Sequence, residues 1–380
     1  MSLLAPVGIL LATGVTRFAP MASGSGIPQV LYAAILARKS VHHPLEDQLL
    51  SIKTALVKAL STGIGFISGA SIGIEGPMVQ ISAAVFTAVG RVMKKKFPRI
   101  DFQSYVVAGA GTGFAAVFNA PLGGITFALE EVVVGDFGRL RHLVLVAVIV
   151  SGLTAQALIG NESYFGSPLL GAYSSSLIRC ALLIGILGGI LGGLFGRIVT
   201  SDFLRAFGRR WWIRALFFGS LVGVIGYYYS GKAGGSNYSI TREFFSTGVA
   251  SLPLSFPIAK LLATAFSALS GIGGGILAPS MSIGAWMGIS AAKLAMFPNL
   301  KVCALLGMVA YFSGTFQIPI TAVIVVMEIT HQYDIIFPMM IAALCAFLIA
   351  KLIMPESLYH VLIHKNFTHT ETSDAIEIPG

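Results

Sequence analysis

Three glycine- and proline-rich breaks contain residues whose types and spacing could bind an ion. They are GSGIP at 24–28, GIEGP at 73–77 and GGILAP at 274–279, and each precedes an apolar run. Glycine permits bends that other residues rarely adopt, and proline suits the first turn of a helix because it lacks an N–H. A helix that begins there presents free backbone N–H groups and its positive dipole end, which attract an anion. Several such starts converging on one point could hold an anion and still release it.

Carboxylates stand at or near such breaks. Glu75 is the acid of GIEGP, and Glu130 and Glu131 form the pair in ALEEV. A charged side chain in a membrane span costs roughly 2.5–3.5 kcal/mol, so such an acid is a functional candidate. A carboxylate on the path of an anion would compete with that anion and titrate with it. The structural alternatives are a dipole-complementing acid for Glu75 and an interfacial pair near Arg139 and Arg141 for the other two.

The composition places these residues in a lipid bilayer. Of the 380 residues, 55% are hydrophobic and 11% are charged, against about 25% charged in ordinary globular proteins. The mean hydropathy is +0.83. Such a chain has too little polar surface to cover a soluble particle. We therefore predict a multi-pass membrane protein and exclude a cytosolic enzyme, a nucleic-acid-binding domain and a disordered scaffold.

The net charge of +9 is explained first by topology, because Lys and Arg gather in cytoplasmic loops. The basic clusters lack the interleaved aromatic residues of an RNA-binding face, so we predict no nucleic-acid partner. Cys180, Cys303 and Cys345 lie in apolar stretches without a CxxC pair, and the histidines lack metal-ligand spacing. We expect no disulfide framework, no metal site and no cofactor.

The elements that must position the breaks are helices of uneven length. The runs 177–199 and 335–352 are long enough to span a bilayer. Other apolar runs are interrupted and end at Gly or Pro, namely 54–69, 78–92, 105–119, 122–134, 280–297, 303–312 and 320–330. Irregular backbone survives at membrane depth only where protein buries it or water lines it, so broken helices indicate a transport pathway.

An internal repeat relates two parts of the chain. GAGTGFAAVFNAPLGGITFALEE aligns with GMVAYFSGTFQIPITAVIVVMEI, so that Pro121 meets Pro319 and Glu130 meets Glu328 at an offset of 198. Upstream, GASIGIEGP aligns with GIGGGILAP at an offset of 202. The two offsets differ by four residues, which corresponds to a small difference in loop length. Because few unrelated apolar segments would align Gly, Pro and Glu in two blocks, we predict a true duplication.

The orientation of the repeats follows from their loops. KKKFPR at 94–99 is strongly basic and KLAMFPNLK at 293–301 is less so, which favours an inverted repeat. We predict a first membrane repeat at 1–160, a linker at 161–176, a second repeat at 177–365 and a tail at 366–380. Paired interrupted segments in two such halves indicate a substrate site near the midplane.

The three breaks and Tyr359 in ESLYHVL together resemble the CLC family of chloride channels and chloride/proton antiporters, from about residue 20 to Lys365. The resemblance implies an all-α polytopic fold of two inverted repeats whose broken helices meet at a midplane anion site. It implies a homodimer that exchanges chloride for protons and is not an enzyme. The short tail leaves no room for paired regulatory domains, and we expect a bacterial-type member in the cell (inner) membrane with a shortened first repeat.

The resemblance assigns roles residue by residue. Ser25 and Tyr359 would offer hydroxyl groups to a central chloride, Ile276 and Leu277 would offer backbone N–H groups, and Gly76 is a further chloride-binding position.

The acids receive roles in the same way. Glu75 resembles the gating glutamate, whose carboxylate occupies the outer anion site and moves away when protonated. Glu131 resembles the inner glutamate that passes protons to the cytoplasm, with Glu130 as an auxiliary. We expect Glu328 to have a packing role.

Two departures and two rivals stay open. Ile74 stands where family members usually carry Lys or Arg, and Leu277 replaces a usual Phe.

A passive chloride channel of the same fold is the closest rival, and such a channel would generally carry a non-acidic residue at position 131. A fluoride/proton exchanger would carry Met in place of Ser25 and would lack Tyr359. An intramembrane hydrolase would need a nucleophile and base within the spans, which the sequence does not offer.

Overall fold

The computed structural model describes residues 4–38, 44–97, 100–133, 137–160, 163–168, 177–202 and 210–367. Within these ranges the chain is helical and forms no strand, apart from two isolated backbone bridges. The first half contains α1 (Ala5–Thr16), the 3-10 turn η2 (Pro20–Ala22), α2 (Ile27–Arg38), α3 (Pro44–Leu49), α4 (Ile52–Ile67), α5 (Glu75–Met93), α6 (Phe102–Phe118), α7 (Pro121–Phe127), the π-type turn η3 (Ala128–Val132) and α8 (Phe137–Ile159).

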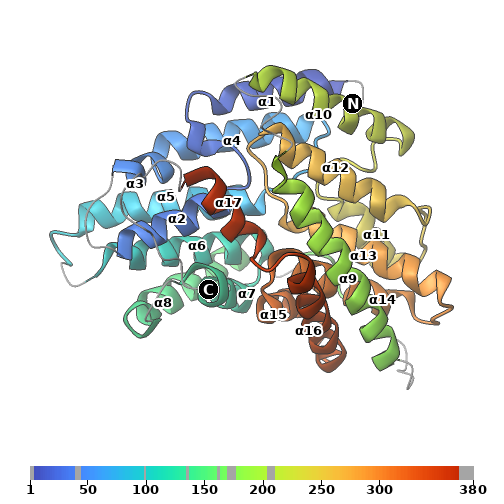
Figure 1. Ribbon diagram of the computed structural model, residues 1–380. Coiled ribbons are helices and arrows are strands. Elements are labelled where there is room, and N and C mark those ends of the chain that lie inside the picture. The colour runs from blue at the N-terminus through green and yellow to red at the C-terminus, as the bar shows by residue number, and fades with distance from the viewer. Residues whose placement is uncertain are drawn as a thin grey trace.

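The second half contains α9 (Leu177–Val199), α10 (Trp211–Tyr228), α11 (Tyr238–Thr247), α12 (Phe256–Ser270), α13 (Leu277–Leu294), α14 (Leu300–Phe316), α15 (Pro319–Thr330), α16 (Ile336–Ile353) and α17 (Leu358–Phe367). Most helices of the second half lie on the other side of the molecule, whereas α10 lies beside α1 (Figure 1). Helix α5 packs on α6 as α13 packs on α14, and α6 packs on α8 as α14 packs on α16. The predicted all-α fold of two repeats is confirmed.

The helices begin and end where the sequence forces a break. Asn119 caps the end of α6 and Gln317 caps the end of α14, both with a positive φ, and Pro121 and Pro319 begin the next helices. Proline tolerates the first turn because no N–H is needed there. For the same reason α5 and α13 begin two residues before their prolines, earlier than the predicted runs at 78 and 280.

Three helical stretches are long and apolar enough to cross a membrane among the described residues. They are Pro44–Ile67, Leu177–Val199 and Ile336–Phe367. The second and third contain the long spans that the sequence predicts. The first joins α3 to α4 and was predicted only in part, because its amino end carries the polar residues Glu46 and Asp47. The remaining apolar helices are shorter, as the interrupted runs indicate.

Small residues allow the helices within a repeat to approach at backbone distance. Gly284 on α13 faces Gly307 on α14, and a Cβ on either would overlap the backbone of the other. Gly113 on α6 stands against α5, where a Cβ would lie 2.6 Å from the Met78 carbonyl oxygen. Such close contact is typical of helix packing in membranes and explains much of the excess glycine.

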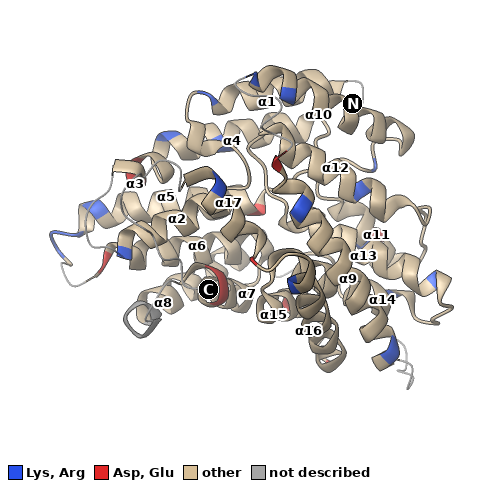
Figure 2. Ribbon diagram, in the orientation of Figure 1, with Lys and Arg blue, Asp and Glu red and all other residues tan. Residues whose placement is uncertain are grey.

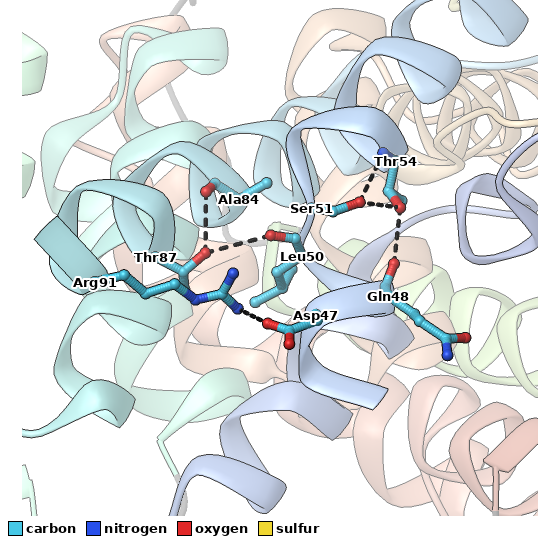
Figure 3. Close-up of polar contacts among 8 residues, drawn as sticks. All are labelled: Asp47, Gln48, Leu50, Ser51, Thr54, Ala84, Thr87 and Arg91. Atoms are coloured by element: carbon cyan, nitrogen blue, oxygen red, sulfur yellow. Dashed lines mark hydrogen bonds and ion pairs between the residues drawn. The ribbon is translucent and has the colours of Figure 1, made fainter. Parts of the chain in front are cut away.

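Charged residues lie mainly at helix ends and in loops, and long stretches of helix carry none (Figure 2). At one edge an ion pair between Arg91 on α5 and Asp47 on α3 ties the two helices together (Figure 3). The Thr87 hydroxyl donates to the Ala84 carbonyl oxygen at 3.0 Å, within the same turn of α5. The ion pair thus connects α3 to the carboxyl-terminal part of the helix that begins at Glu75.

Helix α17 returns across the molecule to the first repeat (Figure 1). It packs on α2, where the Phe367 ring stacks on Tyr32 with a centroid distance of 4.8 Å. The predicted linker is described at 163–168, whereas 161–162 and 169–176, like 368–380 of the predicted tail, lie outside the described residues. The predicted repeat and tail boundaries therefore stay predictions.

Candidate ion-transport site

The three glycine- and proline-rich breaks meet at the centre of the molecule. Gly24 pairs with Gly273 and Gly73 pairs with Gly275 in isolated backbone bridges. The Gly73 N–H donates to the Gly275 carbonyl oxygen at 2.7 Å, and the Gly275 N–H returns the bond at 2.8 Å. Segments that lie far apart in the sequence are thereby joined, and the helix starts that follow them are fixed relative to one another.

Two of these starts present backbone N–H groups that no side-chain cap covers. Helix α5 begins at Glu75 and α13 begins at Leu277, and neither has a side-chain N-cap hydrogen bond. The first N–H groups of a helix have no intrahelical acceptor. Gly76 lies against the third break, and a Cβ there would come within 2.6 Å of Ser25 Oγ. A side chain at this position would therefore obstruct the space beside the Ser25 hydroxyl.

The two predicted hydroxyl groups are both buried at this centre. Among the described residues, Ser25 Oγ and the Tyr359 hydroxyl have no hydrogen-bond partner. Tyr359 is fully buried, its ring stacks on Phe316 at 5.2 Å, and its hydroxyl lies near Ser25 and within electrostatic range of Glu75 and Glu131. Buried hydroxyl groups are nearly always hydrogen-bonded, so an unpaired pair marks a place for an acceptor.

Glu75 is fully buried and is held at both carboxylate oxygens. The Ala278 N–H donates to Oε2 at 3.4 Å, and the Tyr164 hydroxyl donates to Oε1 at 3.2 Å. Ala278 belongs to the first turn of α13. The carboxylate therefore lies where the amino end of α13 would bind a free anion. Sequence reasoning missed Tyr164, because it stands in an irregular segment outside the recognised motifs.

The π-type turn η3 separates the two adjacent acids. The Glu130 carboxylate accepts the Ile320 N–H at 3.1 Å and the Thr321 N–H at 2.6 Å, at the start of α15. Glu131 points elsewhere, and its buried Oε1 has no partner among the described residues. One member of the pair is thus paired with backbone, and the other keeps a buried oxygen unpaired.

Glu328 repeats the arrangement of Glu130 in the opposite direction. Its carboxylate accepts the Leu122 N–H at 3.1 Å and the Gly123 N–H at 2.8 Å, at the start of α7. Each repeat therefore caps a helix of the other repeat. This position agrees with the packing role predicted for Glu328.

A cavity of about 520 Å³ opens beside Glu75, and we call it the outer cavity because the resemblance places Glu75 at the outer anion site. Ile74 lines it with 43% of its surface exposed, so the departure from Lys or Arg leaves an apolar group at its wall. Tyr164, Tyr238 and Arg242 also line it. Arg242 is the basic residue of this lining, and its Nη1 donates to the Tyr238 hydroxyl at 2.6 Å.

Two buried lysines were also missed. Lys58 on α4 is fully buried and donates to the Gly24 carbonyl oxygen at 2.7 Å, next to Ser25. Lys260 on α12 is fully buried and donates to three consecutive carbonyl oxygens, with Gly235 the nearest at 2.5 Å. The two lysines stand 202 residues apart, the offset already found for the breaks. That spacing is the signal that could have identified them.

The fold and this centre define a polytopic membrane protein whose broken helices meet between two repeats. The model of the family described as voltage gated chloride channel matches residues 7–351, and the chain belongs to this family. The resemblance drawn from the motifs is therefore confirmed.

Curated relatives extend over most of the chain. An H(+)/Cl(-) exchange transporter ClcA of Vibrio cholerae is 32% identical over 371 residues, which cover 92% of this chain and 76% of that protein. A protein of the same name from Cronobacter sakazakii is 30% identical over 399 residues, covering 100% of this chain and 81% of its own length.

Solved structures share the fold. A slow cyanobacterial Cl−/H+ antiporter matches with a TM-score of 0.81 at 23% identity, over 96% of this chain and 86% of that chain. A CLC-type fluoride/proton antiporter matches with a TM-score of 0.70 at 23% identity, over 95% and 96% of the two chains. At these identities the likeness concerns the fold alone.

Proposed function

We propose that this chain moves chloride across a membrane in exchange for protons. One observation carries the proposal: the Glu75 carboxylate accepts a backbone N–H at the amino end of α13, where a chloride ion would bind. Charged carboxylate and chloride therefore compete for the same donors. A protonated Glu75 loses its charge and gives up this place, so entry of chloride is linked to uptake of a proton.

Chloride would bind next at the centre. The Ser25 and Tyr359 hydroxyl groups supply neutral donors, and the N–H groups of Ile276 and Leu277 supply backbone donors, with Gly76 keeping the approach open. Support comes from the two buried hydroxyl groups, which lack a partner within the described part of the chain. Neutral donors replace the hydration shell of an anion without trapping it, which suits a site that must bind and release.

Protons would be transferred to Glu131, where their route separates from the path of chloride. This acid and Glu75 both lie within electrostatic range of Tyr359, so the phenol interacts with each of the two acids. The buried Oε1 of Glu131 is not paired with backbone in the described structure, so it is able to take up a proton. Glu130 would act as an auxiliary beside it. In this scheme the proton and chloride share the region around Tyr359 and then separate.

The same fold also supports a passive chloride channel, and Glu131 favours the exchanger because a channel has no need of a buried inner acid. Ser25 and Tyr359 favour chloride over fluoride. We further propose that the protein is not an enzyme and uses no cofactor, the transported ions being its ligands. Among the described residues, no cluster of three or more His, Cys, Asp or Glu could hold a metal.

We propose a homodimer in the cell (inner) membrane, with one pathway in each subunit. Helices α7, α8, α15 and α16 lie along one edge of the molecule (Figure 1). Helix α8 exposes Val146, Val150 and Leu153, and α16 exposes Phe337 and Leu344. A second copy would cover part of this apolar edge and lipid the rest. Cross-linking through cysteines introduced on α16, in membranes, tests this arrangement.

A flux assay in liposomes tests the exchange itself. Purified protein is reconstituted with a chloride gradient and no proton gradient, and the internal pH is followed while a membrane potential is clamped. Exchange predicts that chloride flow drives protons uphill. Chloride flow without any proton movement would instead identify a passive channel.

A further inference from the structure

The gating carboxylate has a hydrogen-bond partner outside the motifs that define the centre. The Tyr164 hydroxyl donates to Glu75 Oε1 at 3.2 Å, while the Ala278 N–H donates to the other oxygen at 3.4 Å. The carboxylate is thus held from two directions, by the backbone of α13 and by a side chain from the segment between the repeats. A hydroxyl donor stabilises a charged carboxylate more than a neutral one, so this contact favours the charged, seated form of Glu75.

Tyr164 is itself held in a defined position. Its ring packs edge-on against Phe118 at 5.5 Å, Phe165 at 5.0 Å and Tyr238 at 4.8 Å between centroids. The Phe165 N–H donates to the Ile329 carbonyl oxygen at 3.2 Å, which anchors the segment to α15 of the second repeat. Aromatic contacts on three sides fix the ring, so the hydroxyl is preorganised toward Glu75.

The position of Tyr164 relates it to ion entry as well as to Glu75. Tyr164 and Glu75 both line the outer cavity, whereas Glu75 itself is fully buried. A proton or anion that arrives through this cavity therefore meets the Tyr164–Glu75 contact before it reaches the first turn of α13.

We propose that Tyr164 is a positioning residue that latches the gating carboxylate: its hydroxyl holds charged Glu75 over the amino end of α13. The latch opens when Glu75 is protonated, and chloride can then take its place. This inference rests on the proposed function, because Tyr164 acts through Glu75. It adds a determinant of how readily the gate opens, in a segment outside the family motifs.

Other titratable groups surround this contact and must be separated from it. Tyr359 approaches Glu75 from α17, and Lys58 belongs to α4, which packs on α5. Tyr238 and Arg242 face the outer cavity from α11 and contact each other. Tyr238 is a matched control, because its ring packs on Tyr164 while its hydroxyl accepts from Arg242.

The test compares Tyr164→Phe with Tyr238→Phe in the reconstituted full chain, with chloride and proton fluxes recorded separately while bath pH and chloride are varied. Loss of a hydrogen bond to a charged group changes an equilibrium by about tenfold or more. For Tyr164→Phe we expect the pH of half-maximal chloride flux to rise by about one unit, and the chloride concentration for half-maximal flux to fall several-fold. Tyr238→Phe should leave both values unchanged.

A second comparison separates a latch from a packing effect. In a Glu75→Gln background there is no charged carboxylate to hold, so adding Tyr164→Phe should not change the chloride flux further. Wild-type pH and chloride dependence in Tyr164→Phe would overturn the proposal, and so would an equal effect in the Glu75→Gln background. Should the wild-type chain fail to drive protons uphill, the exchange proposal fails, whereas chloride flux still tests the latch.

Discussion

Two pairs of helices, α7 with α15 and α5 with α13, each join a helix start of one repeat to a helix start of the other. The contacts are symmetric in the first pair and asymmetric in the second. At α7 and α15 the contact is reciprocal: Glu130 caps α15 and Glu328 caps α7, each through two backbone N–H groups. The two acids stand 198 residues apart in the repeat. All four carboxylate oxygens accept a donor at a helix start, where a negative charge is most stable.

At α5 and α13 the contact runs in one direction. Glu75 reaches across to the Ala278 N–H of α13, but its counterpart 202 residues later is Leu277, an apolar residue. The start of α13 therefore binds a carboxylate from the other repeat, whereas α5 receives none from Leu277. The difference teaches that the duplicated fold supplies matching helix starts, and that a single acid without a counterpart distinguishes one start from the other.

We expect the largest effect from Glu75→Gln, which removes the carboxylate that distinguishes α5 from α13. The amide imitates the protonated side chain, so it should not compete with chloride for the α13 N–H groups. We expect proton coupling to be abolished while chloride still passes, measured as the loss of uphill proton movement in liposomes. Uphill proton movement that survives in this variant would show that Glu75 is not the gate.

The inner acid is tested within its own pair. Glu131→Gln should stop proton transport and spare chloride conduction, because Glu131 would lie off the anion path. Glu130→Gln is the comparison one residue away, and as an auxiliary whose carboxylate is bound to the start of α15 it should weaken proton coupling much less than Glu131→Gln. The opposite pattern, coupling lost in Glu130→Gln and kept in Glu131→Gln, would reverse the assignment within the pair.

The central site is expected to respond more gently. Tyr359→Ala removes one neutral donor and leaves Ser25 and the N–H groups of Ile276 and Leu277 in place. A neutral hydrogen bond contributes about 0.5–1.5 kcal/mol, so chloride affinity should fall roughly 2- to 13-fold rather than vanish. Calorimetric titration with chloride measures the change, and the chloride-to-proton flux ratio should rise as chloride slips past Glu75. Unchanged affinity and an unchanged ratio would place the central site elsewhere.

Much of the architecture could be predicted from the sequence because it is local. The positions of glycine and proline predict the helix breaks, and the recurrence of those positions predicts the duplication, because both can be seen in short segments of sequence. The predicted starts of α5 and α13 are three residues late, because a proline in the first turn does not mark the first residue of that turn. The residues assigned to the central site were predicted from their resemblance to family motifs and not from their spacing.

The contacts made by isolated residues could not be predicted in the same way. Tyr164 reaches Glu75 across 89 positions from an irregular segment, and neither periodicity nor a motif relates the two. The capping of α15 by Glu130 was missed for a related reason. Adjacent acids look alike in a sequence, and the π-type turn that contains both Glu130 and Glu131 is visible only once the helices have packed.

The smallest effect tests the symmetric pair through stability. Glu130→Gln and Glu328→Gln each replace a carboxylate that accepts two backbone N–H groups by an amide with one oxygen, so each should destabilise the fold by about 1–3 kcal/mol. Because the contacts are reciprocal, the two losses should be similar. Glu131→Gln changes an acid whose buried Oε1 has no partner in the described structure, so it should leave stability unchanged or raise it. Thermal unfolding of the detergent-purified variants compares the three. Equal destabilisation by Glu131→Gln would mean that the inner acid is as much a structural residue as its neighbour, and the contrast between the two pairs would then fail.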